Sequence, residues 1–555
     1  MTDVKHMKWW GWGKEGVGFH FEDKPGFAPF VDYAIGIDLW KTPAQEPIAF
    51  DTLTTPKSKA TKVIVAALVA ISGAANVSTD DELRVVHTYG KSIRDLLRIR
   101  ASAIKRAVDV VVYPADEAQV QAVVDYASEN GYVVIPFGGG SNIAGSLEPI
   151  ASEKRIIISL DLGLLAKVTA IDEGSGLATI QAGAQGPDIE EQLNARGWTM
   201  GHFPDSFTHS TVGGWVATRS SGMQSDVYGD IADIARGMRM VRPNEATTVI
   251  RPLPSSSTGP SVREMILGSE GRLGVITEVT VNVHRTPAVR EIIGYLFPSW
   301  EAGIAAMHEI SESDAKPTVT RVSDAREAGF SFATSKAVTG IDAQKILQRY
   351  LKARGWDLEN INLSFIGYEG SKSHVAYEKA IVKSIVKKHG GMAVGKGPGA
   401  LYDQKKFDTP YLRDFLLDRG AAADVSETAA PWSKLNQMHD AVYAAANKAY
   451  DEIGVKGWIM SHLSHSYHSG ACLYFTFAFV YKTDAIAEYD VVKQAIQQAF
   501  IDNGGTLSHH HGVGVEMSAW MEQDISSGGV SLIKGLFDTA DPQHILNPGK
   551  VLAGE

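Results

Sequence analysis

The sequence predicts an α+β protein that is divided into two or three domains. A chain of 555 residues is too long to bury its apolar side chains in one hydrophobic core. From Val108 onwards a β-branched strand, a helical stretch and a second strand lead into three glycines, the order of elements in an α/β unit. Strands and helices alternate again over residues 360–389, which predicts a second α/β domain.

The first hundred residues differ in texture from the rest of the chain. They combine an aromatic-rich start, a linker at residues 54–62 and helical periodicity at residues 80–98. The basic residues 92–106 are predicted to form one helix. The longest apolar stretch, residues 63–75, is shorter than the ~20 residues that a membrane span needs. We interpret it as a buried helix, and contact with a membrane surface stays open.

The α/β unit begins with a strand at residues 108–113 and a helix at residues 116–130. Apolar residues recur at helical spacing within that helix, and Gly131 ends it. The strands expected after the helix lie at residues 132–136, 156–160, 167–171, 177–182 and 275–284.

The composition excludes several classes of protein. The formal net charge is −11, so the chain is a poor general binder of nucleic acid, and an anionic substrate needs a local basic pocket. The single cysteine, Cys472, has no intrachain partner, which excludes a disulfide framework and fits a reducing compartment. Its apolar neighbours favour a core position over a role as nucleophile.

A glycine loop after the second strand is the first candidate binding motif. Glycines lack Cβ atoms, so backbone N–H groups can turn towards a phosphate, and Ser and Asn side chains can add donors. A plain tight turn explains the motif alone equally well. The candidate residues are Pro136, Phe137, Gly138, Gly139, Gly140, Ser141 and Asn142.

Two further segments are rich in small residues. The first suits a flat ligand that lies against backbone, and the second leads into a strand; each alone could be a surface loop. The first comprises Pro204, Asp205, Ser206, Phe207, Thr208, His209 and Ser210 and continues to Thr218, Arg219, Ser220 and Ser221. The second comprises Glu270, Gly271, Arg272, Leu273, Gly274, Val275 and Ile276.

The usual nucleotide-binding patterns are not met. A G-x-G-x-x-G pattern runs from Gly11 to Gly16, but it follows no predicted strand and opens no predicted helix. No G-x-x-x-x-G-K-[ST] pattern occurs in the chain. A nicotinamide enzyme or a nucleoside triphosphatase is therefore disfavoured.

The three small-residue segments, in this order, resemble the FAD-binding domain of the vanillyl-alcohol-oxidase-like family. The tail also fits, since Asp541-Pro542 and residues 546–550 are similar to the closing motif of that family. The resemblance implies noncovalent FAD, with its pyrophosphate on the glycine loop and the other segments lining the rest. It implies a helical N-terminal extension (1–105), a two-subdomain FAD-binding domain (106–287), an α/β cap domain (288–503) and a C-terminal segment with an active-site His loop (504–555).

Within that family the chain resembles the alkyldihydroxyacetonephosphate synthases. The motifs that carry this resemblance are MKWWGWG at residues 7–13, ETAAPW at 427–432, GACLYF at 470–475 and SHHHGVG at 508–514. The related D-lactate and glycolate dehydrogenases usually have a Glu-His-Gly type motif where this chain has His510, His511 and Gly512.

Three consecutive histidines, His509, His510 and His511, are candidate catalytic residues. Adjacent residues alternate in direction, so three in a row do not easily converge on one metal ion, and no metal is expected. A solvated polar loop is the alternative interpretation. However, the run lies between apolar segments and ends in Gly-x-Gly, as a loop that approaches a ligand does. Neutral imidazoles can relay protons or hydrogen-bond a phosphate.

Tyr474 and two arginines complete the candidate site. Strict alternation over residues 473–481 puts phenylalanines on one face of a strand and Tyr474 with small residues on the other, although a core tyrosine is the commoner case. By the resemblance, Tyr474 falls on the family's proton donor/acceptor, Arg413 on its substrate-phosphate arginine and Arg321 on another active-site arginine. A surface ion pair with Asp414 is the alternative for Arg413.

The resemblance implies a reaction without net redox change. The acyl chain of acyl-dihydroxyacetone phosphate is exchanged for a long-chain fatty alcohol, through a covalent intermediate on flavin N5. An apolar tunnel for the alkyl chain is expected, but its residues cannot be traced from the sequence. Two alternatives stay open: an FAD-linked D-2-hydroxyacid dehydrogenase or oxidase, and a non-enzymatic flavoprotein or membrane-surface module.

One departure from the family concerns the substrate head group. The family usually has a basic residue just after the histidine-glycine motif, whereas Val515 and Glu516 follow here. We also expect a homodimer with peripheral membrane contact, in the cytoplasm or on the cytoplasmic membrane face of a bacterium. This location is expected because the chain shows no signal peptide and no peroxisomal C-terminal signal.

Overall fold

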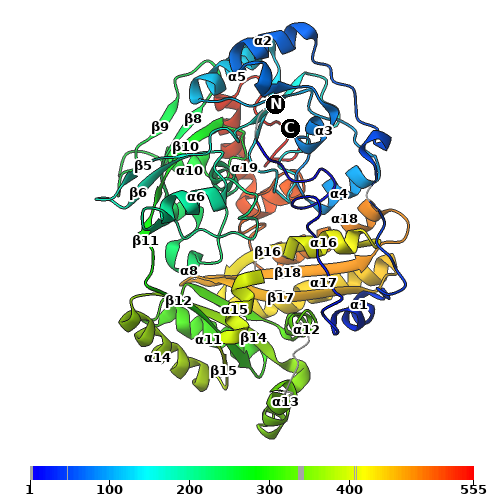
Figure 1. Cartoon of the computed structure of the whole chain (residues 1–555), viewed down its shortest axis with the longest axis vertical. Coiled ribbons are helices and arrows are strands. Elements are labelled where there is room, and N and C mark those ends of the chain that lie inside the picture. The colour runs from blue at the N-terminus through cyan, green and yellow to red at the C-terminus, as the bar shows by residue number, and fades with distance from the viewer. Residues whose placement is uncertain (1–3, 47, 336–342, 406, 408, 555) are drawn as a thin grey trace.

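The computed structural model describes residues 4–46, 48–335, 343–405, 407 and 409–554. Figure 1 shows two bodies stacked along the long axis of the molecule, with the strands β1 to β10 in the upper body and β12 to β18 in the lower one. The chain belongs to the mixed α+β class that the sequence predicts.

The glycine loop follows a small, mostly parallel sheet in the upper body. Its strand order is β1 (Val77–Ser78), β2 (Val110–Val112), β4 (Ile157–Asp161) and β3 (Val133–Phe137), with β1 antiparallel to β2 and the other pairs parallel. Helix α5 (Glu117–Asn130) connects β2 to β3. Asp116 caps its start by accepting from the Gln119 N–H, and Gly131 ends it in the left-handed conformation.

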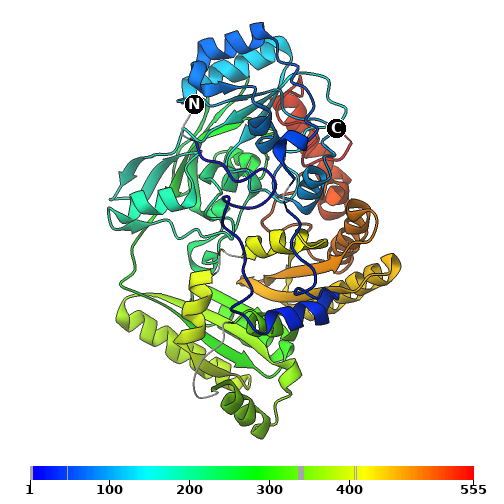
Figure 2. The ribbon, with the colours of Figure 1, turned by 45° about the vertical axis from the view of Figure 1, so that its right-hand side comes forward.

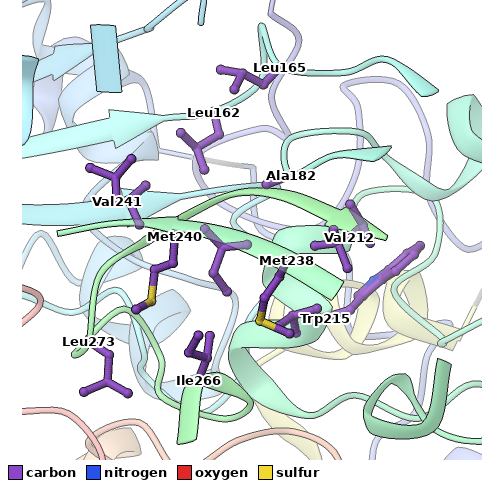
Figure 3. Close-up of a cluster of buried hydrophobic side chains, with 14 of the residues drawn as sticks. Leu162, Leu165, Ala182, Val212, Trp215, Met238, Met240, Val241, Ile266 and Leu273 are labelled. Atoms are coloured by element: carbon purple, nitrogen blue, oxygen red, sulfur yellow. The ribbon is translucent and has the colours of Figure 1, made fainter. Parts of the chain in front are cut away.

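A second sheet of the upper body is antiparallel. Its order is β5 (Val168–Asp172), β6 (Leu177–Gln181), β10 (Val275–Asn282), β8 (Ala235–Val241) and β9 (Thr248–Ile250). Figure 3 shows the buried cluster beside it, where Trp215 and Val212 of α7 (Val212–Thr218) lie near Met238 and Met240 of β8. The remaining short elements are α6 (Gly186–Asn194), β7 (Trp198–Thr199), α8 (Ser225–Tyr228), α9 (Ile231–Ile234), α10 (Val262–Ile266) and β11 (His284–Arg285).

The lower body is a seven-stranded antiparallel sheet. Its order is β15 (Met392–Gly395), β12 (Val289–Phe297), β14 (Asn362–Gly370), β13 (Val319–Ser323), β17 (Gly457–Ser466), β18 (Gly470–Val480) and β16 (Ala421–Pro431). We call this body the cap.

Alternation along the strands gives the cap sheet two different faces. Phe475, Phe477 and Phe479 pack under four helices, whereas Tyr474 and Ala478 face the opposite way. The helices on the phenylalanine face are α11 (Trp300–Glu312), α14 (Lys372–Lys388), α17 (Leu435–Ile453) and α18 (Ala485–Asp502). The helices on the other face are α1 (Phe27–Ile35), α12 (Ala325–Ala333), α13 (Ala343–Ala353), α15 (Lys396–Lys405) and α16 (Thr409–Leu417).

The first hundred residues contact both bodies. Helix α1 packs on the cap, strand β1 joins the upper sheet, and α3 (Asp81–Val86) packs on β2. Helix α4 runs from Ile93 to Arg100 and is shorter than predicted, since Ser102 takes a left-handed backbone conformation just beyond it. Helix α2 (Lys62–Ser72) is buried on one side only, because Leu68 packs inside while Val63 is 77% exposed.

The C-terminal segment returns to the upper body. Helix α19 (Met521–Ala540), red in Figure 2, lies beside the upper body. Beyond it, Leu546 bridges to Val134 of β3, and the Asn547 N–H donates to the Val134 carbonyl at 2.9 Å. Among the described residues, no helix is both long and apolar enough to cross a bilayer.

Candidate active site

A cavity of about 310 Å³ lies between the glycine loop and the Tyr474 face of the cap sheet. This volume is typical of small-molecule sites. At one end the lining is polar and includes the glycine loop, Tyr474, His510 and His511. At the other end the lining is apolar and comes from α1, α16 and the strands β16 to β18. The cavity therefore joins a polar pocket to an apolar arm.

The glycine loop presents unused backbone donors to this cavity. None of the N–H groups of residues 138–143 donates a hydrogen bond to another described residue. A row of free N–H groups beside a strand end is an anion-binding arrangement. The side chain of Asn142 is occupied, since its Oδ1 accepts from Ala144 and Ser146 and its amide donates to the His511 carbonyl. The loop therefore fits the pyrophosphate of FAD through its backbone.

The glycine loop and the predicted segment at residues 204–210 meet at Gly139. A Cβ on this residue would lie 1.6 Å from the carbonyl oxygen of His209, so only glycine allows the two backbones to approach. We expect Gly139→Ala to push the loop out of position and to reduce the FAD content of the purified protein to less than half. The measurement is the ratio of flavin to protein absorbance. Gly535→Ala is the matched control, because nothing lies within 4 Å of its Cβ position in α19.

The histidine loop, residues 508–514, is held by two buried carboxylates. Glu427 of β16 accepts from the backbone N–H groups of His509, His510 and His511, the last two at 3.1 Å. Glu270 accepts from the N–H groups of Val513 at 2.6 Å and Gly514 at 3.0 Å. Glu427 belongs to the cap and Glu270 to the upper body. The loop therefore ties the two bodies together at the cavity.

Tyr474 lies in the polar pocket with imidazoles on both sides. Its ring stacks on His462 at 4.9 Å and on His510 at 5.9 Å between centroids. Burial, together with Asp205 and Glu427, raises the pKa of Tyr474 well above its usual value. Burial and the other histidines lower the pKa of His510 and bring that of His511 to about 3. At neutral pH the site therefore holds a protonated tyrosine beside neutral imidazoles.

Arg413 is a half-buried cation that lines the cavity. Its Nε and Nη2 atoms are buried and donate to no described residue. Burial lowers the pKa of nearby Lys91 to about 8, with Arg413 adding to the effect and Asp414 opposing it. An unpaired buried guanidinium is costly unless a ligand supplies the acceptors. Arg413 therefore supplies the local positive charge that an anionic substrate needs in a chain of net charge −11, and Lys91 lies behind the cavity wall, where its ammonium donates to the Lys8 carbonyl at 2.9 Å.

Arg321 does not line the cavity. Its guanidinium donates to Glu327 at 2.5 Å and lies 3.1 Å from Nδ1 of His462, the imidazole that stacks on Tyr474. Although burial alone would raise it, His462 and Arg321 bring the pKa of Glu327 to about 2. Arg321 is thus placed to hold the His462 imidazole, which in turn stacks on Tyr474.

Several predicted cofactor residues lie outside the cavity wall. Leu273 and Val275 are core residues, and Leu273 is among the buried side chains labelled in Figure 3. Arg272 donates to the Lys550 carbonyl and packs on Phe537, and Arg219 pairs with Glu264 at the surface. Alternation along strands and turns sends every other side chain away from a ligand. Phe207, Thr208, His209 and His509 also do not line the cavity. The other predicted residues line it: Pro136, Phe137, Gly138, Gly139, Gly140, Ser141, Asn142, Pro204, Asp205, Ser206, Ser210, Thr218, Ser220, Ser221, Glu270, Gly271, Gly274, Ile276, Arg413, Tyr474, His510 and His511.

The sequence analysis expected an apolar tunnel but did not identify the residues that form this arm. Trp12, only 1% exposed, lines the cavity from the N-terminal segment, and its backbone N–H donates to the Asp414 carboxylate at 2.6 Å. This segment contains the G-x-G-x-x-G pattern that we set aside. Its aromatic richness was the available signal. The remaining residues of the arm are Phe27, Phe30, Val31, Ala34, Ile35, Phe330, Leu412, Leu416, Ala423, Trp458 and Ala478.

The two residues that depart from the family pattern do not line the cavity. Val515 packs towards Gly145, and the Glu516 N–H donates to the Ala144 carbonyl at 3.2 Å. Burial raises the pKa of Glu516 to about 8. Lys493, from α18, is electrostatically coupled to both Glu516 and His511, so a buried positive charge lies near this position.

A group of possible metal ligands lies behind the histidine loop. Atoms of His465, Cys472, His509 and His510 fall within 4.8 Å of one another. His465 already has partners, the Gly222 carbonyl at 2.9 Å and the Ser464 hydroxyl at 2.7 Å. Burial raises the pKa of the Cys472 thiol well above its usual value, which disfavours the thiolate that metals bind.

Two family models match the chain. "FAD binding domain" matches residues 108–250, and "FAD linked oxidases, C-terminal domain" matches residues 286–551. The matches confirm the predicted FAD-linked fold and the FAD cofactor.

Curated relatives and a solved structure are more specific. The chain is 40% identical to an alkyldihydroxyacetonephosphate synthase from Dictyostelium discoideum, over 85% of this chain and 78% of the relative. It is 36% identical to the enzyme of that name from Trypanosoma brucei brucei, over 86% and 78%. A solved alkyldihydroxyacetonephosphate synthase superimposes with a TM-score of 0.85 at 34% identity, covering 98% of each chain. A mitochondrial D-lactate dehydrogenase from Arabidopsis thaliana is only 23% identical, over 80% and 73%.

Proposed function

Because the chain belongs to the alkyldihydroxyacetonephosphate synthase family, we propose that it exchanges the acyl chain of acyl-dihydroxyacetone phosphate for a long-chain fatty alcohol. One observation carries this proposal: a single cavity is lined by an arginine with two buried donor atoms that lack a partner among the described residues, a tyrosine among imidazoles and an apolar arm. These three parts fit the phosphate, the reacting carbon and the alkyl chain of such substrates. A small hydroxy acid would leave the apolar arm unused.

The residues have separate roles in this reaction. The fork of Arg413 holds the phosphate. Tyr474 gives and takes the proton at the reacting carbon, and the histidine loop supports it. Arg321, through His462, keeps the tyrosine ring in position. The cap sheet and α1 exclude water, so that the alcohol competes successfully as the second substrate.

FAD binds noncovalently in this proposal. The free N–H groups of residues 138–143 hold its pyrophosphate, and the residues around Ser206, Ser220 and Gly271 hold the remainder. When bound, FAD would supply a nucleophilic flavin N5 for covalent catalysis at the reacting carbon. Acid precipitation tests the mode of binding, because noncovalent flavin is released into the supernatant.

The activity is tested by incubating the purified holoenzyme with acyl-dihydroxyacetone phosphate and labelled hexadecanol. We expect labelled ether product and no net change in the flavin spectrum. D-lactate and glycolate are added separately, and neither is expected to bleach the flavin. Bleaching without ether formation would overturn the proposal in favour of the dehydrogenase.

The apolar arm predicts a specificity for chain length. Ala478 lies on the same strand face as Tyr474, four residues or about 13 Å further along β18, and it is only half-buried where the arm begins. We expect Ala478→Phe to lower kcat/KM for hexadecanol by about tenfold, since the ring occupies the path of the chain. The value for octanol should change by less than about threefold. Equal losses for both alcohols would contradict this assignment of the arm.

We also propose that the mouth of the apolar arm rests on a membrane surface, on its cytoplasmic side, and that the protein forms homodimers. The support for membrane contact is that Tyr33 and Trp40 are 67% and 72% exposed beside α1, which lines the arm. Sedimentation with lipid vesicles tests the contact, and the variant with Tyr33→Ser and Trp40→Ser should sediment less. Light scattering of the purified protein tests the dimer.

A further inference from the structure

A chain of hydrogen bonds connects the upper body to the histidine beside Tyr474. Asp230, just before α9, is 2.9 Å from the Tyr467 hydroxyl, measured from its Oδ2. The same hydroxyl lies 2.6 Å from Nε2 of His509. Nδ1 of His509 lies 2.8 Å from Nδ1 of His510, whose ring stacks on Tyr474. Of these four residues, His510 alone lines the cavity.

The Asp230 carboxylate at one end sets the direction of every hydrogen bond in this series. A carboxylate can only accept, so the Tyr467 hydroxyl donates to Asp230 and its oxygen must accept from His509 Nε2–H. When His509 is neutral, it has no proton on Nδ1, so this atom accepts from Nδ1–H of His510. His510, carrying its proton on Nδ1, is left with a free lone pair on Nε2. The chain therefore assigns a tautomer to each histidine.

The charge of Asp230 supports this direction. Burial by itself would raise the pKa of Asp230, but the charges that His509 and His465 carry when protonated, together with the hydrogen bond from Tyr467, hold it below its usual value. The neighbouring Asp226 differs, because burial raises its pKa to about 7 and it accepts from Thr320 and the Ser466 N–H. Asp230 is thus the ionised end of the chain, and Asp226 belongs to the contact with the cap.

We propose that Asp230 and Tyr467 are positioning residues that fix the tautomers of His509 and His510 and so make Nε2 of His510 the proton acceptor of the site. The proposal deepens the proposed function and rests on it for the identity of the reaction. A proton that arrives at Nε2 of His510 lets its Nδ1–H shift towards His509. The His509 Nε2–H then shifts towards Tyr467, and the Tyr467 O–H shifts towards Asp230. One proton enters this series of hydrogen bonds at His510, and one is held at the other end by Asp230.

This assignment provides a place for the proton of the Tyr474 hydroxyl. Tyr474 is protonated at rest, so it can accept a proton from the reacting carbon only if its own proton leaves, and Nε2 of the stacked His510 is ready to accept that proton. The two rings lie nearly parallel, with an interplanar angle of 15°, so that both meet the same part of the cavity. An acid and a base side by side allow a proton to leave and another to return without rearrangement of the site.

The kinetic test uses Tyr467→Phe and Asp230→Asn in the FAD-loaded protein. Each variant is expected to lower kcat by roughly 10- to 100-fold with KM changed less than about threefold, because no substrate contact is lost. The kcat of the double variant should be no lower than that of the more impaired single variant, since both substitutions interrupt the same series of hydrogen bonds. Losses that multiply in the double variant, a change confined to KM, or kcat within twofold of the parent would each overturn the proposal.

Matched controls separate this role from a structural one. Asp226→Asn changes a neighbouring carboxylate that is outside the chain, and Tyr295→Phe removes a buried hydroxyl 2.9 Å from that of Tyr368 in the cap. Both should leave kcat within about threefold of the parent. FAD content and Tm are measured for every variant, and a variant that loses flavin is replaced by Asp230→Ser or Tyr467→Leu.

A spectroscopic test does not depend on the reaction. In protein labelled with ¹⁵N-histidine, His510 should show its proton on Nδ1 and His509 on Nε2. The signals of these two among the 17 histidines are identified by their loss in His510→Gln and His509→Gln. Tyr467→Phe should return His510 to a mixture of tautomers. The opposite tautomers in the parent would overturn the inference even if the enzyme makes the ether, and the predicted ones would sustain it even if it does not.

Discussion

Tyr474→Phe is expected to lower the kcat of ether formation by about 10³-fold while FAD stays bound. General acid–base groups contribute about 10²–10⁴-fold, and this hydroxyl belongs to a cavity-lining ring that stacks on two imidazoles. The ring stacks between His462 and His510 do not need the oxygen, so the phenylalanine keeps the packing. The measurement is single-turnover formation of labelled ether under saturating substrate.

The matched control for this variant is Tyr368→Phe, a buried tyrosine of β14 in the cap core. Tm and flavin content should be unchanged in Tyr474→Phe, since a phenyl ring fits the same space. The assignment of Tyr474 as the donor and acceptor at the reacting carbon fails if the variant retains more than about a tenth of the parent kcat. Loss of flavin in this variant would instead indicate a binding role.

Arg413→Met is expected to lower kcat/KM by about 10²–10³-fold and, at the same time, to stabilise the protein without substrate. A bidentate guanidinium–phosphate contact is strong, and methionine cannot replace it. In the absence of ligand the same guanidinium has two buried donors, Nε and Nη2, without partners, so its removal relieves a cost of folding. The measurements are steady-state kinetics and thermal unfolding of the substrate-free protein.

Arg100→Met provides the comparison, because this arginine already pairs with Asp418 at 2.6 Å and lies outside the cavity. We expect it to leave kcat/KM unchanged and to lower Tm slightly. Addition of inorganic phosphate should raise the Tm of the parent but not that of Arg413→Met. A lower Tm in substrate-free Arg413→Met would show that the arginine has a structural partner, and it would remove the phosphate assignment.

The segments that line the proposed FAD site could be found from the sequence, because glycines and small polar residues are confined to a few places in the chain. Gly139 illustrates the reason: its backbone touches that of His209, and any side chain would prevent this. The same pattern does not tell which residues of a segment face the ligand. Leu273 and Val275 were therefore predicted as contacts although they are buried in the core.

The role of Glu427 was visible only in three dimensions. In the sequence it is one residue of a motif, but in the fold its carboxylate accepts from three consecutive N–H groups more than eighty residues later. Acidic residues are common, and nothing in their spacing reports such a contact. The same is true of Asp230 and Tyr467, which reach the histidine loop from different bodies.

The sequence by itself determined the class of fold, the cofactor segments and the family, because these rest on local backbone chemistry and on ordered motifs. Only the tertiary structure decided what surrounds the reacting atoms. The apolar arm is built from helices and strands that are each ordinary core elements, and it exists because α1 and α16 cover the Tyr474 face of the cap sheet. The tautomers of His509 and His510 depend on hydrogen-bond partners that are far away in the sequence. Packing brings such groups together over distances that no sequence spacing records.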